Sequence, residues 1–378
     1  MLVKQINSMG QISAGDWNGL TGLDYPFLRH EFLLALEESG AVSPATGWQP
    51  AHLLVMANNE LLALMPLYFK NHSWGEYVFD QQWADAYQHH GEQYYPKALT
   101  AIPFTPCQGL RIAVKPGVDA SSVTQLLLTF IQQQAAEQGF SSWHCLFPAL
   151  PQLELLRTIG LSIREGVQFQ WFNRGYAGFD DFLQTLSASK RKMIRKERRK
   201  IGEQGIELLQ IAGPKVSQQQ WRVFFEFYRV TYLKNGREPY LTLGFFQQLA
   251  ADIPEQLLLV LAVKEDNYVA AALSFVGNDC LYGRYWGCYA EYNALHFEAC
   301  YYQGLDYCIE HGLQRFDSGA QGEHKISRGF EPVSTYSAHW IKDSGFAKAI
   351  DHFLLREQKA IQDYKQDAAA YLPFKQES

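Results

Sequence analysis

The residues best suited to chemistry lie close together in the segment from Asp317 to Arg328. Glu323, His324 and Lys325 place an acid, a base and a cation side by side. A histidine or carboxylate with a pKa near neutrality can accept the proton that an ammonium group must lose before its nitrogen attacks a carbonyl carbon. We therefore expect Asp317, Glu323 and His324 to be catalytic. The alternative is a polar loop that satisfies its own backbone.

The same segment has features of a ligand-binding loop. Gly319 and Gly322 allow the backbone to approach a ligand closely. Lys325 and Arg328 could hold phosphates or stabilise a developing oxyanion. With Gln321, these two cations are the candidate substrate-binding residues of the segment.

Two neighbouring elements add further candidates. In the strand expected at 281–289, Arg284 is a charged residue in the strand interior, and we expect it to bind substrate together with Trp286. The helix expected at 295–311 begins with His296 and Glu298, which could face a cleft next to that strand. Alternatively, His296 is only a histidine in the capping region of the helix.

A basic run lies within the helix expected at 179–204. Residues 190–200 contain eight basic side chains and one acid, Glu197, while the rest of the chain carries 25 basic and 38 acidic residues. Arg191, Arg195 and Arg198 are spaced to share one helix face. A local positive field on an acidic protein attracts anions, so we expect these three arginines to bind phosphate. A solvated helix face is the alternative.

A third polar cluster lies between residues 72 and 97. His72, Glu76 and Asp80 have a spacing that invites a metal hypothesis, but Gly75 and the β-prone residues 77–79 disfavour a continuous helix, and we expect no metal. We expect instead a polar and aromatic wall for a sugar or peptide acceptor, formed by His72, Glu76, Asp80, Trp83, Asp85 and Lys97. A lid packed by its own aromatic residues is the alternative.

The elements that must position these residues are both helical and extended. Apolar periodicity and end signals predict helices at 27–38, 121–138, 179–204, 217–235, 242–251, 295–311 and 345–366. Strands are predicted at 51–57, 61–69, 142–147, 206–211, 257–264, 268–277, 281–289, 314–318 and 334–341. The least structured join is expected near 165–178.

An internal repeat organises these elements. The segment 137–143 ends a helix at glycine and enters a strand, and 310–316 does the same with similar residues in matching places. The turn and strand at 59–67 likewise resemble those at 267–275. We predict two related halves, 1–170 with an insert at about 70–100, and 171–378 with the catalytic cleft. Chance similarity of common elements is the alternative.

The composition sets the class of protein. The chain has 378 residues, of which 47% are hydrophobic, so it can form two domains with real cores. A net charge of −6 argues against a nucleic-acid coat protein. No apolar run approaches the roughly 18 residues of a membrane span, and no export signal is visible. Six cysteines without metal or disulfide spacing indicate a reduced, cytoplasmic protein.

The order of elements in the second half, a three-stranded meander followed by a helix and a parallel strand, is that of the GNAT acyltransferase core. The phrases at 189–200, 284–288, 295–303 and 316–330 resemble a bacterial GNAT-superfamily family described as peptidoglycan biosynthesis/recognition. First-half phrases at 27–33, 47–50, 72–80 and 103–106 are similar to the same family. The likeness runs from about Asp24 to about Phe353. The family is similar to the FemAB-like enzymes, which have two tandem GNAT folds and transfer amino acids from charged tRNA onto cell-wall precursors.

This resemblance implies an α/β protein with two tandem GNAT-like folds that acts as an N-acyl or aminoacyl transferase. The acceptor would be an amine of a peptidoglycan precursor or a related phosphate-linked molecule, and peripheral membrane contact is compatible with this. The stretch 286–296 lacks the glycine pattern with which GNAT enzymes hold the pyrophosphate of CoA. Aminoacyl-tRNA is therefore favoured over acyl-CoA as the donor, and no cofactor is certain. Two other functions stay open, a non-enzymatic cell-wall-fragment recognition protein and an acetyl-CoA-dependent N-acetyltransferase.

Overall fold

The computed structural model describes residues 1–320 and 322–375. The chain forms two compact units. Unit 1 contains Met1–Gly166 and Ser334–Asp363, and unit 2 contains Val167–Val333 and the chain from Tyr364 onward. The predicted division at 170 lies close to the first crossing between the units. The chain crosses back at 333 and again at 363, so the last strand and most of the last helix belong to unit 1 rather than to the second half.

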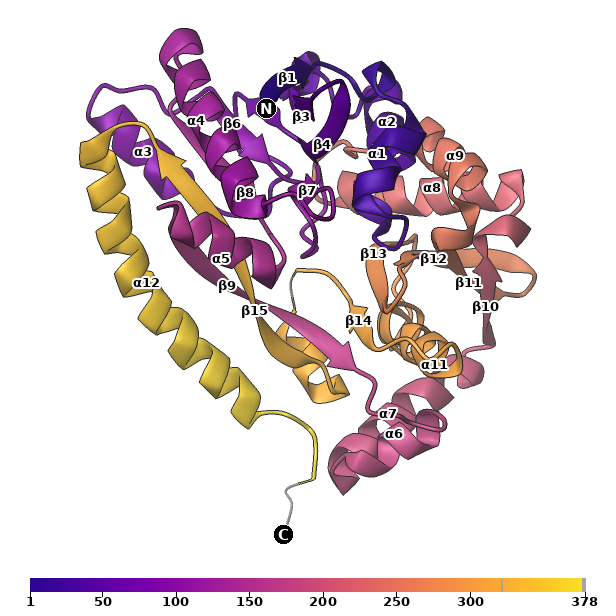
Figure 1. The fold of residues 1–378 in the computed structure, drawn as a ribbon. Helices are drawn as coiled ribbons and strands as arrows, with labels where there is room; N and C mark the ends of the chain where they lie inside the picture. The colour runs from indigo at the N-terminus through magenta and orange to yellow at the C-terminus, as the bar shows by residue number, and fades with distance from the viewer. Residues whose placement is uncertain (321, 376–378) are drawn as a thin grey trace. The chain divides into compact units, whose positions relative to one another are not determined.

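Unit 1 contains two groups of strands. The first has the order β1-β3-β4-β7, and the second has the order β15-β8-β6-β5-β2. The strands are β1 Leu2–Ile6, β2 Trp48–Pro50, β3 His52–Ala57, β4 Glu60–Met65, β5 Tyr68–Lys70, β6 Lys97–Thr100, β7 Ala113–Val114, β8 Ser142–Leu146 and β15 Glu331–Ile341. The helices are α1 Ala14–Thr21, α2 His30–Glu38, α3 Gln81–His89, α4 Ala120–Gln138, α5 Leu150–Thr158 and α12 Ser344–Ala370 (Figure 1).

Unit 2 has the strand order β10-β11-β12-β13-β14-β9. These strands are β9 Ser162–Phe172, β10 Ile206–Ala212, β11 Leu257–Lys264, β12 Asn267–Val276, β13 Cys280–Cys288 and β14 Arg315–Asp317. The helices are α6 Phe179–Thr185, α7 Ala188–Glu203, α8 Gln218–Lys234, α9 Leu243–Asp252, α10 Leu295–Phe297, the π-helix η6 Glu298–Tyr302, α11 Gln303–Glu310 and the 3-10 helix η7 Glu323–Arg328. β9 and β15 each cross the boundary between the units.

The two units repeat one plan. In unit 1 an antiparallel β3–β4 hairpin turns through Asn58 and Asn59, both with positive φ, and in unit 2 the β11–β12 hairpin turns through Glu265 and Asp266 in the same way. β6 pairs in parallel with β8 after the long helix α4, just as β13 pairs in parallel with β14 after α11. Two tandem GNAT-like folds of mixed α/β class are therefore present.

Each unit has its own hydrophobic core. In unit 1, Leu127 and Ile131 of α4 pack among buried residues of β3, β4 and β8. In unit 2, Phe316 of β14 and Leu305 of α11 lie at the centre of an aromatic cluster. Phe316 lies so close to the helix that a Cβ on Gly304 would fall 2.4 Å from its ring. The core of unit 2 thus holds β14 tightly against α11.

The structure corrects several predicted boundaries. The predicted unstructured join at 165–178 is wrong over its first part, because β9 extends to Phe172. Its polar residues hid the strand, since Gln168 and Gln170 are buried side chains rather than loop residues. The helix predicted at 179–204 is broken between α6 and α7, where Leu186 is buried in an extended conformation. The strand predicted at 61–69 ends before Pro66 and resumes as β5, because proline cannot donate a ladder hydrogen bond.

A glycine allows α8 to pack directly on β13 (Figure 1). A Cβ at Gly287 would lie 1.9 Å from the backbone oxygen of Phe227 in α8. We expect Gly287→Ala to lower the free energy of unfolding by about 1–3 kcal/mol, because helix and strand must move apart. Gly202→Ala in α7, where nothing lies within 4 Å, is the control. It should raise the free energy of unfolding by about 0.5–1 kcal/mol. Urea titration measures both values, and unchanged stability of Gly287→Ala would contradict this packing.

Candidate functional site

The candidate site lies in unit 2, where β13 and β14 separate. Their recorded parallel pairing ends at Tyr282 and Asp317. On its other edge β13 pairs with β12, and the register shifts so that Leu273 faces Tyr285 while Ser274 faces Gly283. Arg284 is therefore the extra residue of a β-bulge. A bulge bends its strand and changes the direction of its side chains, which here opens a gap beside the end of β14.

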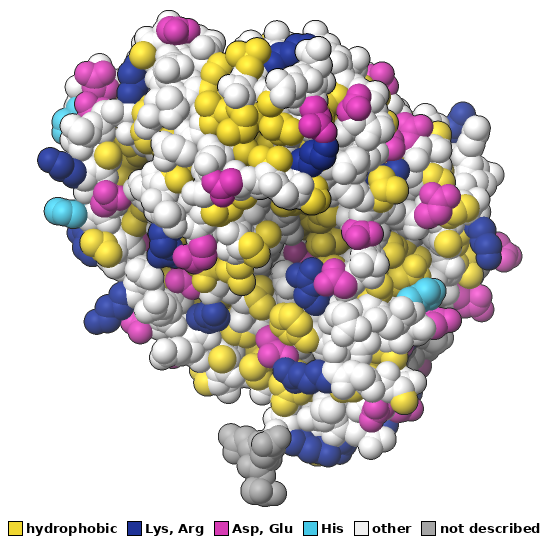
Figure 2. Space-filling view, in the orientation of Figure 1, with side chains coloured by type: hydrophobic (Ala, Val, Ile, Leu, Met, Phe, Trp, Pro, Cys, Tyr) yellow, Lys and Arg dark blue, Asp and Glu magenta, His cyan; other side chains and the backbone are white. Residues whose placement is uncertain are grey.

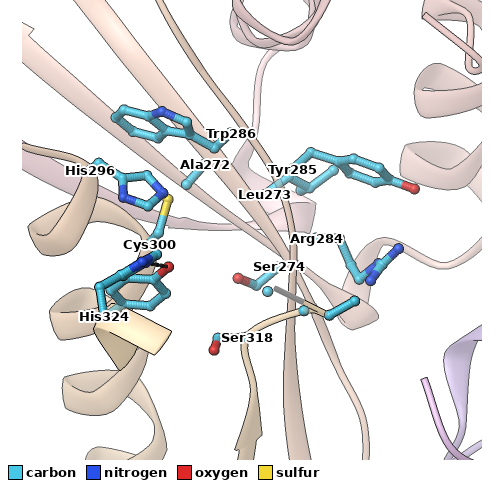
Figure 3. A pocket seen from close by; sticks show the side chains of 14 residues that line it. Ala272, Leu273, Ser274, Arg284, Tyr285, Trp286, His296, Cys300, Ser318 and His324 are labelled. Carbon is cyan, nitrogen blue, oxygen red and sulfur yellow. Dashed lines mark hydrogen bonds between the residues drawn. The ribbon is translucent and has the colours of Figure 1, made fainter. Parts of the chain in front are cut away.

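The gap contains a pocket of about 300 Å³. Figure 3 shows Trp286, His296, Cys300 and His324 on one side, whereas Arg284 and Tyr285 point to the other side. The residues that line the pocket are Ala272, Leu273, Ser274, Gly283, Arg284, Tyr285, Trp286, His296, Cys300, Tyr301, Ser318, Gly319, Ala320 and His324. Four residues predicted from the sequence, Arg284, Trp286, His296 and His324, thus meet in one place.

Two imidazoles provide the bases of the pocket. Nε2 of His324 lies 2.8 Å from the hydroxyl of Tyr301. Burial lowers the pKa of His296 to about 4, with His324, Arg328 and Lys325 adding to the effect. Burial, Arg328 and Lys325 also lower the pKa of His324. Both rings are therefore neutral at pH 7 and can accept a proton.

Asp317 lies behind the pocket rather than on its wall. Its side chain is buried, and its Oδ1 accepts a hydrogen bond of 3.0 Å from the backbone N–H of Gly319. The ammonium group of Lys325, equally buried, donates to the carbonyl of the same glycine at 2.7 Å. Burial raises the pKa of Asp317 and lowers that of Lys325 to about 8. Direct catalysis by Asp317 and direct substrate binding by Lys325 are thus corrected: both side chains hold the loop that forms the pocket wall.

Arg328 is also part of the framework, contrary to the predicted role in substrate binding. Its guanidinium group lies 3.4 Å from the ring centroid of Phe297, and its Nη2 lies 2.7 Å from Oε1 of Glu197 in α7. Tyr302 donates its hydroxyl to the same carboxylate and accepts a bond from Nε of Arg328. Since only 4% of Arg328 is exposed, this network fixes η7 to α7 and to the helix beside the pocket.

The basic helix is only partly available to an anion. Arg198 forms ion pairs with Glu298 at 3.1 Å and with Asp306 at 2.6 Å. Its predicted exposed, phosphate-binding role is therefore corrected, and so is the substrate-binding role of Glu298, which is buried away from the pocket. Arg195 is exposed and pairs with Asp180, and Arg191 is half-buried. Figure 2 shows Lys and Arg side chains spread over this face of the molecule, with acidic side chains among them.

Two other predicted residues of the segment lie elsewhere. The side chain of Glu323 is exposed and accepts a hydrogen bond of 2.9 Å from the hydroxyl of Tyr364. It does not line the pocket, so its predicted catalytic role is not supported by its position. Gln321 lies outside the described residues.

The start of α10 does not fit the usual CoA cradle. GNAT enzymes bind the pyrophosphate through free backbone N–H groups at this helix start. Here the N–H of Asn293 donates to the side chain of Gln204 at 3.1 Å, and the N–H of Leu295 donates to the carbonyl of Tyr292. Lys200 of α7 donates to the side chain of Asn293 as well. The N–H groups of Asn293 and Leu295 are thus bonded within the protein.

The insert of unit 1 does not form the predicted open wall. The ammonium group of Lys97 lies 2.7 Å from Oε2 of Glu76 and also contacts Oδ2 of Asp80. Lys97 is fully buried, while Glu76 is 4% and Asp80 is 3% exposed. Burial raises the pKa of Glu76 to about 7. The carboxylates raise the pKa of Lys97 despite its burial. These side chains bind one another. They form an internal ion cluster rather than the predicted wall that would hold an acceptor.

Of the other predicted wall residues, Trp83 and His72 also contact the protein itself, whereas Asp85 does not show this pattern. Trp83 is buried and packs edge-on against His339, with ring centroids 4.8 Å apart. His72 contacts the backbone oxygen of Thr46 at 3.0 Å. Asp85 is exposed on α3. The alternative of a lid packed by its own residues therefore describes the insert better. Within the described part of the chain, no three His, Cys, Asp or Glu side chains cluster to hold a metal ion.

The matching gap of unit 1 is filled. The last parallel pair of β6 and β8 is Thr100 with Cys145. Beside this point the fully buried Arg111 donates to the backbone oxygens of Leu146 at 2.8 Å and of Cys107 at 2.6 Å. An internal arginine thus occupies the end of the strand pair in unit 1, whereas unit 2 has a pocket there.

The pocket also contains residues that the sequence reasoning missed. Ser318 and Tyr301 lie on its wall, from the end of β14 and from η6. Tyr301 lies five residues after His296, a spacing that would not place it on the same side of an α-helix. Ser318 lies within the polar segment, but it was not predicted because its side chain is uncharged. The π-helix that presents Tyr301 is not visible in the sequence pattern, and such turns often mark functional sites.

Comparison with known proteins identifies the class. Residues 8–376 match the model of the FemAB-like family, described as peptidoglycan biosynthesis/recognition. The chain therefore belongs to the FemAB-like family. This confirms the resemblance drawn from the sequence.

Solved structures share the fold at low identity. FemX is 12% identical, with 93% of this chain and 100% of that chain covered and a TM-score of 0.53. The C-terminal domain of a putative lysylphosphatidylglycerol synthetase from Agrobacterium fabrum is 10% identical, with coverage of 92% and 98% and a TM-score of 0.52. L-PGS from Bacillus licheniformis is 11% identical, with coverage of 88% and 97% and a TM-score of 0.50. A search of curated proteins finds no match.

The helices give no sign of a membrane span. None of those in the described residues is long and apolar enough to cross a bilayer. The cytoplasmic location stays a prediction.

The ion cluster of unit 1 makes a stability prediction. We expect Lys97→Met to lower the free energy of unfolding by about 3–5 kcal/mol, because two buried carboxylates lose their cation. Lys115→Met is the control, since Lys115 pairs with Glu60 at the surface, where the side chains are 41% and 57% exposed. That variant should change stability by less than about 1 kcal/mol. Equal effects of the two changes in urea titration would show that the cluster is not buried.

Proposed function

We propose that the protein transfers an acyl or aminoacyl group onto an amine of a peptidoglycan precursor or a related phosphate-linked acceptor. The reacting acyl group would bind in the pocket between β13 and β14. One observation carries this proposal: a neutral, accessible imidazole, His324, lines a pocket at the strand separation of a FemAB-like chain. The family and the fold support an acyltransferase role in peptidoglycan biosynthesis.

The proposed chemistry is general-base acyl transfer. The acceptor nitrogen attacks the carbonyl carbon of an activated ester, a C–N bond forms, and the carbonyl electron pair moves to oxygen. His324 accepts the proton that the nitrogen loses. The intermediate then collapses, the bond to the leaving oxygen breaks, and that oxygen takes up a proton. Tyr301, whose pKa is raised by burial, stays protonated and fixes the orientation of the His324 ring.

An aminoacyl-tRNA donor is favoured over acyl-CoA by two observations. The backbone N–H groups of Asn293 and Leu295, next to and at the start of α10, are already bonded within the protein. In addition α7 carries several lysines and is tied to the pocket helix through Arg198 and Glu298. Because α7 belongs to unit 2 and contacts the helix beside the pocket, a nucleic acid bound along α7 would lie close to the reacting groups. The same positive charges of α7 are also suited to binding the phosphates of the acceptor.

His324 provides the test of this function. His324→Gln should reduce the transfer rate by about 10²–10⁴-fold, because the proton acceptor is lost. His311→Gln, at the exposed end of α11, is the control and should change the rate by less than about threefold. Single-turnover assays with charged tRNAs, acyl-CoAs and cell-wall precursors measure the rates. Tight binding of a cell-wall fragment without turnover by any donor would instead support a recognition protein.

The donor hypothesis predicts a charge-specific effect on tRNA binding. Replacing Lys190, Lys192 and Lys196 of α7 by glutamine should weaken tRNA binding and reduce the slope of log affinity against log salt, because fewer counterions are released. Replacing the exposed Lys348, Arg356 and Lys359 of α12 by glutamine removes the same charge and is the control. Filter binding at several salt concentrations compares them. Equal losses in the two triple variants would mean that α7 has no specific role.

A further inference from the structure

Ser318 holds a hydroxyl group that the protein itself does not use. It is the first residue after β14, where the recorded pairing with β13 has ended. Its Oγ is buried and has no hydrogen-bond partner among the described residues. Buried hydroxyls without a partner cost free energy of folding, and native structures contain few of them. Ser318 lines the pocket, and Figure 3 shows it below Ser274 near the wall that carries His324.

The loop that carries this hydroxyl is held from both sides. Gly319 has φ +90, and its N–H and C=O bind Asp317 and Lys325 respectively. The two charged side chains are each only 1% exposed. Two buried groups of opposite charge therefore fix the backbone next to Ser318. Such support from neighbouring residues is what a group needs when its position must be accurate.

Nearby cations act on Asp317, the residue that precedes Ser318. Arg284 lies on the pocket wall, and both Arg284 and Lys325 are near enough to stabilise the charge of Asp317. Hydrogen-bond donors fixed in a site with little water stabilise a developing oxyanion strongly. The hydroxyl of Ser318 is a neutral donor on the pocket wall, so it is suited to a carbonyl oxygen that becomes negative during acyl transfer.

We propose that Ser318 is a catalytic residue whose Oγ–H donates to the carbonyl oxygen of the acyl group as that oxygen becomes negative. Asp317 and Lys325 are positioning residues that act through Gly319. This inference rests on the proposed function and adds to it the group that stabilises the intermediate. Ser318 keeps its proton throughout: the carbonyl electron pair moves onto oxygen when the C–N bond forms and returns when the leaving group departs.

The test combines binding, turnover and stability. The probe is methylphosphonate, a small tetrahedral anion, titrated by NMR against the full chain. Ser318→Ala should bind it at least about tenfold more weakly than the wild type, and kcat for transfer should fall by about 10²–10³-fold. Its thermal midpoint should not fall, because the hydroxyl has no partner to lose. Ser334→Ala is the control, since its hydroxyl donates to Glu165 at 2.6 Å. That variant should lose stability and keep both binding and kcat.

The positioning residues have their own readout. Asp317→Ala should weaken methylphosphonate binding, whereas Asp317→Asn retains an oxygen that accepts the Gly319 N–H and should restore binding to within about threefold. A merely structural aspartate would show the same affinity in every variant that folds.

Each result decides between the hypotheses. If the wild type does not bind methylphosphonate, or if Ser318→Ala binds it equally well, the role of Ser318 is wrong even where transfer is observed. If the probe binds through Ser318 while no donor is turned over, the oxyanion site stands and the proposed transfer reaction fails.

Discussion

The structure of unit 2 depends on where two parallel strands stop pairing. β13 and β14 are held together up to Tyr282 and Asp317, and the bulge at Arg284 then directs β13 away. Every group of the candidate site takes its place from this separation. Arg284 and Trp286 lie on β13, and Ser318 comes directly after β14. The helix after β13 brings His296 and Tyr301 to the opening. A pocket at this point needs no separate domain to form it.

Buried charges make the separation rigid. Asp317 and Lys325 hold Gly319, and Arg328 with Glu197 joins η7 to α7. Buried ion pairs contribute little net stability but are very costly to break singly. In this site their effect is geometric, because the contacts fix the loop at Gly319 and join η7 to α7. The basic helix is consequently a structural neighbour of the pocket as well as a possible binding surface for anions.

The sequence predicted the fold better than the site. Hydrophobic periodicity located α4, α8 and β11 almost to the residue, since each has a strong apolar pattern between clear end signals. β9 was missed because its polar side chains are buried, and local pattern cannot distinguish a paired polar residue from a solvated one. The same ambiguity affected charged residues. Lys97 and Arg198 have the residue types of ligand-binding groups, yet their partners lie 21 and 100 residues away in the sequence and become visible only in the fold. His324 lines the pocket of unit 2, as expected from its polar segment, and its catalytic role stays a prediction.

The arginine at the end of the strand pair in unit 1 limits what can change there. The guanidinium group of Arg111 bonds to the backbone oxygens of Leu146 and Cys107. No single exchange at that position restores an open cleft without leaving carbonyl groups unsatisfied in the interior. The parallel strand pair thus ends at a buried arginine in one unit and at a pocket in the other.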